Sequence, residues 1–197
     1  IGFSSGLFYA TNQGADAAEV AALAAVAAAA GGVYTTHMRN EGDEIVAALD
    51  ETFATAKAAR APVIISHHKC AGPANWGRTV ETLALIDAAA GRQPVGLDAY
   101  PYTASSTVLE AGMAERAPRT IVTWSKPHPD AAGRDLTEIA AEWGVGLRAA
   151  AARGSSPPGP SASVAQRQRR TESRKADERG GPQAQGSGKS GSLPGGR

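Results

Sequence analysis

Strand-like and helix-like segments alternate along the first half of the chain with a period near thirty residues, and this pattern constrains the fold most. Four short apolar segments predict strands, at residues 1–9, 33–36, 63–66 and 95–100. Three alanine-rich segments between them predict helices, at residues 16–30, 43–60 and 77–90. The first helix opens with Asp16 and Glu19 in a capping-box arrangement. Such alternation predicts an α/β fold with a parallel sheet and right-handed crossovers.

The chain changes character after residue 153. Residues 154–197 contain eight Lys or Arg and three Asp or Glu, and half of them are Gly, Ser or Pro. A segment of this composition cannot bury enough apolar surface to offset its ordering entropy, so we expect it to be disordered. The remaining 153 residues are too few for a complete (β/α)₈ barrel, which needs about 250.

Several classes of protein are excluded by simple counts. A single cysteine, Cys70, excludes an intrachain disulfide framework and a thiolate zinc cluster. The longest apolar run, around residues 20–30, is shorter than the roughly 20 residues of a membrane span. The basic tail lacks aromatic residues for base stacking. We therefore expect a cytoplasmic protein without nucleic-acid or membrane partners. The chain begins at Ile1 rather than Met, which favours a fragment.

Polar side chains follow each predicted strand. His37 ends one strand and His67 ends the next, thirty positions later, while Asp98 and Tyr100 accompany the third. Sites in parallel α/β folds lie at the carboxyl ends of the strands. Two histidines at the same position in successive units favour a metal or acid–base site over two unrelated structural residues.

Strand alternation separates the neighbours in the SHHK segment, because side chains two positions apart share a face. It groups Ile65 with His67 and Lys69, and Ser66 with His68 and Cys70. We therefore expect His67 to be a ligand and His68 to be structural. Cys70 reads as a small buried or loop residue. His128, between two prolines, reads as a solvated or packed residue.

Four segments of the chain resemble successive blocks of the N-acyl-D-amino-acid deacylases, or D-aminoacylases, which are zinc-dependent members of the amidohydrolase superfamily built on a (β/α)₈ barrel. The segments are GFSSGLFY, YTTHMRNEGDEIVAALDE, PVIISHHKCAGPANWG and DAYPYTASSTVL. The resemblance extends to about residue 153. It implies an incomplete (β/α)₈ TIM barrel, about strands 4–7, over residues 1–109. It also implies a lid-like insertion after strand 7 over residues 110–153, ahead of the low-complexity tail at 154–197.

The same resemblance implies roles for six residues. His37 and His67 match the two histidines that bind the catalytic zinc from the fifth and sixth strands. Three residues match positions that hold the carboxylate of the D-amino acid: Lys69, Tyr100 and Ser106. Tyr9 matches a residue that lines the same pocket. The implied cofactor is zinc, and the implied partner is a small N-acyl-D-amino acid.

Some family features have no counterpart in this sequence. They are an HxH motif on the first strand, a bridging metal ligand before the fourth, and a catalytic Asp on the eighth. The catalytic residue is therefore unknown. We expect a zinc-dependent amidohydrolase that releases a carboxylate and a D-amino acid, inactive as this truncated chain, with a tail typical of an out-of-frame reading. The alternatives are a fragment of another metal-dependent amidohydrolase of the cyclic amidase type, or a non-catalytic product. The non-catalytic product is either a truncated chain with no activity or a binding module that uses the basic tail. Lys69, Tyr100 and Ser106 favour a substrate with a free carboxylate.

Overall fold

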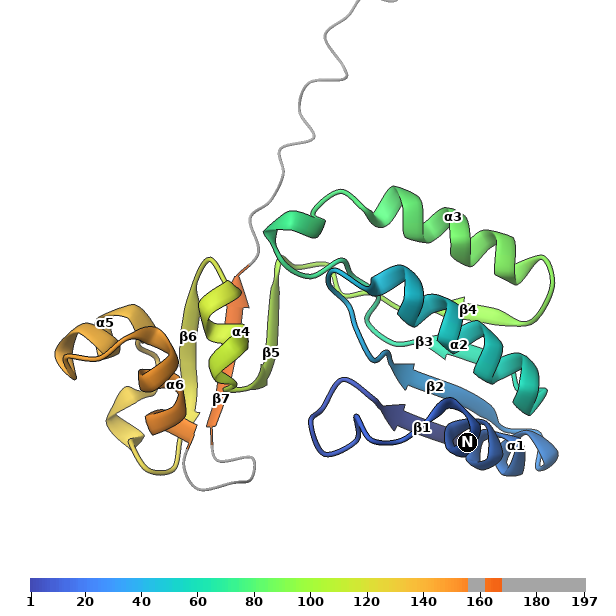
Figure 1. The fold of residues 1–197 in the computed structure, drawn as a ribbon, viewed down its shortest axis with the longest axis horizontal. Coiled ribbons are helices and arrows are strands. Elements are labelled where there is room, and N and C mark those ends of the chain that lie inside the picture. The colour runs from blue at the N-terminus through green and yellow to red at the C-terminus, as the bar shows by residue number, and fades with distance from the viewer. Residues whose placement is uncertain (156–161, 168–197) are drawn as a thin grey trace, which may run out of the picture.

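The computed structural model describes residues 1–155 and 162–167 of the 197-residue chain, and these residues form two sheets (Figure 1). The first sheet is parallel, and its spatial order is that of the chain: β1 (Gly2–Gly6), β2 (Val33–His37), β3 (Val63–Ile65) and β4 (Val95–Leu97). The second is antiparallel, in the order β5 (Ala104–Val108), β7 (Ala162–Arg167) and β6 (Thr120–Ser125). The predicted α/β fold with a parallel sheet is confirmed.

Three helices connect the parallel strands and lie along the same side of that sheet (Figure 1). They are α1 (Ala17–Ala29), α2 (Ile45–Ala59) and α3 (Thr79–Ala90). The predicted cap of α1 is present, since the Asp16 carboxylate accepts a hydrogen bond from the backbone N–H of Glu19 at 2.8 Å. Small alanine side chains allow α1 and α2 to approach each other and the strands closely.

The core of this unit lies between the helices and the sheet. Tyr34 and Val63 pack with Val20 and Ala24 of α1 in one cluster. A second cluster follows toward α3 and contains Met38, Ile45, Leu49, Ile65, Cys70 and Ile86. Alternate residues of β2 therefore face the helices, which leaves His37, one position out of phase with Tyr34 and Thr36, on the other face.

The second unit contains three helices and its own core. Its helices are α4 (Ala111–Arg116), α5 (Leu136–Glu142) and α6 (Leu147–Ser155), and a short 3₁₀ turn, η2 (Pro129–Ala131), precedes α5. The first unit has a similar turn, η1 (Pro73–Asn75), between β3 and α3. Leu109, Val122, Leu136 and Ile139 are fully or nearly buried in this core, together with alanines of α6. None of the described helices is long and apolar enough to cross a membrane.

The C-terminal part differs from the sequence-based expectations in two places. The apolar spacing over residues 135–153 predicts one helix, but the structure has two, because Gly144 adopts a left-handed φ of 63° between them. The disorder expected for residues 154–197 does not hold for residues 162–167, which form strand β7, where Val164 pairs with Thr107 of β5 and Val122 of β6. This strand forms by backbone pairing on both sides. The other residues of that segment beyond Ser155 lie outside the described residues.

Candidate metal centre and its pocket

Two histidines meet beyond the carboxyl ends of β2 and β3. His37 is the last residue of β2, and His67 is the second residue after β3. Their imidazole ring centroids lie 4.4 Å apart, with the ring planes at 80°. Parallel pairing of the two strands, with Thr36 opposite Ile65, brings the loops that follow them together. The structure thus brings together the two residues that the thirty-residue spacing singled out.

A third side chain, Glu41, completes the cluster, and the sequence analysis missed it. Its Oε2 lies 3.4 Å from His37 Nε2, and its Oε1 lies 3.0 Å from His67 Nδ1. One potential ligand atom from each of the three residues lies within 4.8 Å of the others. Two further acidic residues, Asp43 and Glu44, follow in the same loop but are exposed. Glu41 differs from these two residues in being buried. Sequence spacing does not show which acidic residue is buried, so it could not single out Glu41.

Lys69 balances the charge of Glu41. Its Nζ lies 2.6 Å from Glu41 Oε2 and donates to the backbone carbonyl of His67 at 3.0 Å. Burial raises the pKa of Glu41, but the close side-chain contacts with His37 and His67 and the positive charge of Lys69 outweigh burial and hold that pKa well below its usual range. The buried carboxylate is therefore ionised at neutral pH.

The cluster fits a divalent metal ion. His37 Nε2 and Glu41 Oε1 are buried and have no hydrogen-bond partner among the described residues. Unpaired buried acceptors are costly, and a cation satisfies them. Two imidazole nitrogens and one carboxylate oxygen are ligands that zinc accepts, and three protein ligands with one open position are usual for catalytic zinc.

The backbone turns sharply at His67, and this corrects the expected alternation. His67 has a left-handed φ of 42°, and its N–H donates to Asp98 Oδ1 at 2.6 Å. The Asp98 carbonyl accepts from the N–H of His68 at 2.8 Å. The alternation predicted that Ile65 shares a face with His67. Instead, Ile65 is fully buried on the helix side. The turn shifts the phase, so the alternation holds only from His67 onward.

The remaining histidines have structural surroundings. His68 is buried, and its Nε2 lies 2.9 Å from Thr82 Oγ1 of α3, as expected for a residue turned away from the cluster. Burial lowers the pKa of His68. Cys70 is also buried, with its Sγ 3.8 Å from the same hydroxyl. In the second unit, His128 packs against Trp143, with ring centroids 4.6 Å apart.

The cluster opens into a cavity of about 640 Å³. The four predicted substrate-binding residues all line it: Tyr9, Lys69, Tyr100 and Ser106. Lys69 Nζ lies 5.7 Å from the centroid of the Tyr100 ring. Burial, with smaller contributions from the charges of Glu41 and Tyr102, raises the pKa of Tyr100 to about 12, so its hydroxyl keeps its proton at neutral pH.

Comparison with known proteins decides the family. No family model matches the chain. D-aminoacylase of Alcaligenes xylosoxydans xylosoxydans is 52% identical over 144 residues, which are 73% of this chain and 30% of that protein. A D-aminoacylase crystal structure, described as defining a novel subset of amidohydrolases, matches with a TM-score of 0.78 at 46% identity, over 84% of this chain and 34% of that one.

The chain belongs to the D-aminoacylase family. A second structure, the N-acyl-D-glutamate deacylase of Bordetella bronchiseptica, has a TM-score of 0.78 at 42% identity, over 83% of this chain and 34% of that one. That protein was crystallised with zinc and a phosphonate inhibitor that mimics the tetrahedral intermediate. The chain spans about a third of the length of these relatives.

Further lining residues of this D-aminoacylase-family pocket come from elements that the sequence analysis did not single out. Trp76 follows η1, and Met113 and Arg116 belong to α4. Nothing in the spacing of these residues pointed to the pocket, because η1 and α4 were not themselves predicted. Phe8 lies beside Tyr9 and stacks on His37, with ring centroids 4.8 Å apart and planes at 17°. The imidazole of His37 therefore has the rings of Phe8, Tyr9 and His67 as neighbours.

Proposed function

We propose that this chain is part of a zinc-dependent enzyme that hydrolyses N-acyl-D-amino acids to a carboxylate and a D-amino acid, and that it carries zinc-binding and substrate-binding residues of that enzyme's site. The observation that carries the proposal is the buried, ionised carboxylate of Glu41 between His37 and His67, with the cation of Lys69 beside it. Membership of the D-aminoacylase family supports the same activity. We further propose that β1–β4 correspond to the fourth to seventh strands of a (β/α)₈ barrel, with residues 110–153 as an insertion over its mouth.

His37, His67 and Glu41 are the residues that would hold the metal. Bound zinc supplies a Lewis acid for the carbonyl of the substrate amide. The chain's own contribution is to keep Glu41 ionised and to orient the three ligands. Glu41 is held ionised by its neighbours, and Asp98 fixes the turn that presents His67. The stacked ring of Phe8 limits the orientations open to His37.

The substrate carboxylate would meet Lys69, Tyr100 and Ser106. An ammonium group has three N–H donors. In Lys69 one is directed at Glu41 and one at the His67 carbonyl. The third approaches His67 Nδ1 at 3.0 Å and is available to the pocket when that imidazole binds the metal. The protonated Tyr100 hydroxyl and the Ser106 hydroxyl add neutral donors on the same pocket lining. A free carboxylate accepts hydrogen bonds from these donors and is paired with the Lys69 cation. A cyclic amide has no carboxylate for this position, so we favour the deacylase over a cyclic amidase.

Calorimetry on the full chain tests the proposal. We expect one zinc ion to bind per chain, and N-acetyl-D-methionine to bind only after zinc has been added. The Lys69→Met variant should keep zinc binding and lose binding of this ligand. N-acetyl-L-methionine and a hydantoin serve as ligand controls. Zinc binding that survives both His37→Ala and His67→Ala, or equal binding of the two enantiomers, would contradict the proposal.

A further inference from the structure

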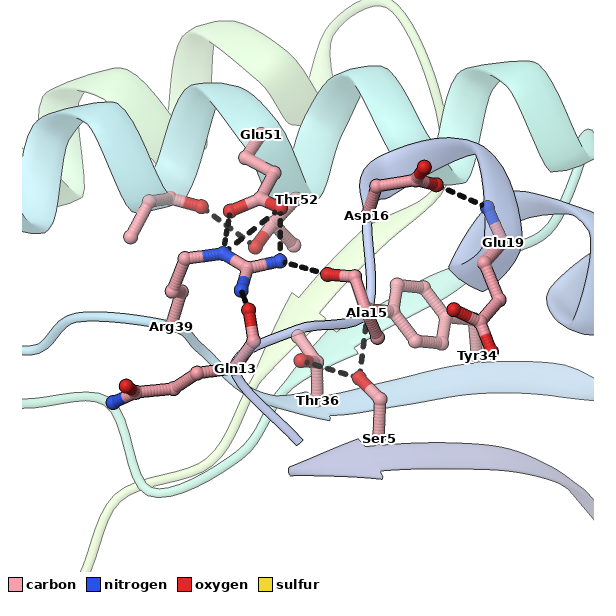
Figure 2. Close-up of polar contacts among 11 residues, drawn as sticks. Ser5, Gln13, Ala15, Asp16, Glu19, Tyr34, Thr36, Arg39, Glu51 and Thr52 are labelled. Atoms are coloured by element: carbon pink, nitrogen blue, oxygen red, sulfur yellow. Dashed lines mark hydrogen bonds and ion pairs between the residues drawn. The ribbon is translucent and has the colours of Figure 1, made fainter. Parts of the chain in front are cut away.

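Arg39 connects the loop before α1 to helix α2, as Figure 2 shows. Its Nε donates to Glu51 Oε2 at 2.9 Å, and its Nη2 donates to Glu51 Oε1 at 2.8 Å. The same guanidinium also donates to two backbone carbonyls of the loop, from Nη1 to Gln13 and from Nη2 to Ala15, both at 2.8 Å. One planar group thus joins a helix side chain to two points of a loop.

This loop, residues 7–15, forms the aromatic wall of the pocket. Phe8 stacks on His37, and the ring of Tyr9 meets His37 edge-on, with centroids 5.2 Å apart. At its start the loop is fixed to β2, because the N–H of Leu7 donates to the carbonyl of His37 at 3.1 Å. Residues 9–14 are exposed, so little packing holds the rest of the loop.

The other hydrogen bonds of the loop are internal to it or return to Gly6. The backbone N–H of Asn12 donates to the carbonyl of Tyr9, and its backbone carbonyl accepts from the N–H of Ala15. The side-chain amide of Asn12 donates to the carbonyl of Gly6. The Gln13 amide donates to the carbonyl of Phe8. Within the described residues, Arg39 is the one side chain from outside the loop that hydrogen-bonds to it. The later half of the loop therefore depends on Arg39 for its position.

We propose that Arg39, anchored by Glu51, is a positioning residue that holds Phe8 and Tyr9 against His37. Arginine suits this role because its rigid fork reaches the carboxylate and both carbonyls together, which a lysine ammonium cannot do. The significance of the role rests on the proposed function, since His37 is a proposed zinc ligand. The tie itself is a property of the metal-free chain and can be measured without zinc.

Hydrogen exchange and NMR on the full chain test this inference. In Arg39→Lys we expect the loop amides, those of Tyr9, Asn12 and Ala15, to exchange at least about tenfold faster. This corresponds to about 1.4 kcal/mol, the lower end for hydrogen bonds to a charged group. The ring protons of His37 should also shift, because Phe8 and Tyr9 no longer hold fixed positions over the imidazole.

Two further variants keep the test decisive. Glu51→Gln leaves Arg39 in place but removes its ionic anchor, and it should move the same resonances and amides in the same direction by a smaller amount. Arg134→Lys disrupts the ion pair with Glu142 in the second unit and should leave both readouts at wild-type values. Should Arg39→Lys fail to fold, Glu51→Gln alone carries the test.

The contrary result is an Arg39→Lys or Glu51→Gln variant with a lower Tm but unchanged loop exchange and unchanged His37 resonances. Arg39 would then only stabilise the fold. A zinc titration of the same samples separates this failure from failure of the proposed function. If the wild-type chain binds no zinc, the proposed function fails, while the exchange and NMR readouts still decide the role of Arg39.

Discussion

Replacing Glu41 by glutamine probes the proposed metal centre most sharply. Glu41→Gln keeps the shape of the side chain and removes the negative charge that contacts the side chains of Lys69, His37 and His67. Lys69 Nζ lies 2.6 Å from the carboxylate, which corresponds to an attraction of about 6 kcal/mol at an effective dielectric constant near 20. The Lys69 side chain is 16% exposed, so water recovers part of this. We expect the free energy of unfolding to fall by about 2–4 kcal/mol.

The same substitution should also weaken zinc binding strongly. Losing a group that only supports a ligand weakens metal binding about 10–100-fold, and Glu41 is proposed as a ligand itself. We therefore expect the zinc Kd of Glu41→Gln to rise by at least about 100-fold. Competition against a fluorescent zinc indicator measures the Kd, and urea unfolding followed by circular dichroism measures stability. Glu44→Gln is the matched control, because Glu44 is exposed in the same loop. If Glu41→Gln binds zinc as tightly as this control, Glu41 is not a zinc ligand and only forms ion pairs within the cluster.

Three further predictions concern the turn, a helix cap and turnover. Asp98→Ala removes the acceptor for the N–H of His67 and should weaken zinc binding about tenfold, whereas Asp98→Asn, which keeps an oxygen there, should stay near wild type in the same titration. Asp135 caps α5; burial raises its pKa, but the N–H group it caps and a neighbouring arginine outweigh burial and lower it. Asp135→Ala should therefore cost about 1 kcal/mol at pH 7, and urea titrations should show this cost shrinking as pH falls below about 4, where the carboxylate is protonated. Finally, the chain should not turn over N-acetyl-D-methionine at a useful rate even with zinc, because the proton-shuttling Asp implied by the family resemblance is absent from the sequence; zinc-dependent turnover lost in His37→Ala would contradict this.

The approach of His37 to His67 could be predicted from the sequence because it follows from strand period and parallel pairing alone. The opposite faces of His67 and His68 could be predicted too, although Ile65 lies on the helix side and not on the face of His67. A left-handed residue at the end of β3 changes the phase, and a histidine in that position carries no sequence signal comparable to a glycine. Glu41 could not be selected, because its burial depends on Lys69 and the two histidines arriving from different loops.

The second unit was harder to predict for a different reason. Strand β7 obtains its order from pairing with β5 and β6 rather than from its own composition, so a composition argument could not find it. Helix periodicity ran through the break between α5 and α6, because apolar residues such as Ile139 and Leu147 continue on both sides of Gly144. Long-range pairing and a single left-handed glycine decided this region.

X-ray absorption at the zinc K-edge, on the full chain loaded with one equivalent of zinc, tests the proposed centre most directly. We expect nitrogen and oxygen atoms bound to the zinc at about 2.0–2.2 Å, with more distant scattering from two imidazole rings. His37→Ala should remove one of the two imidazole contributions. A zinc–sulfur distance of about 2.3 Å, which would place the ion at Cys70, or a spectrum without imidazole scattering, would contradict it.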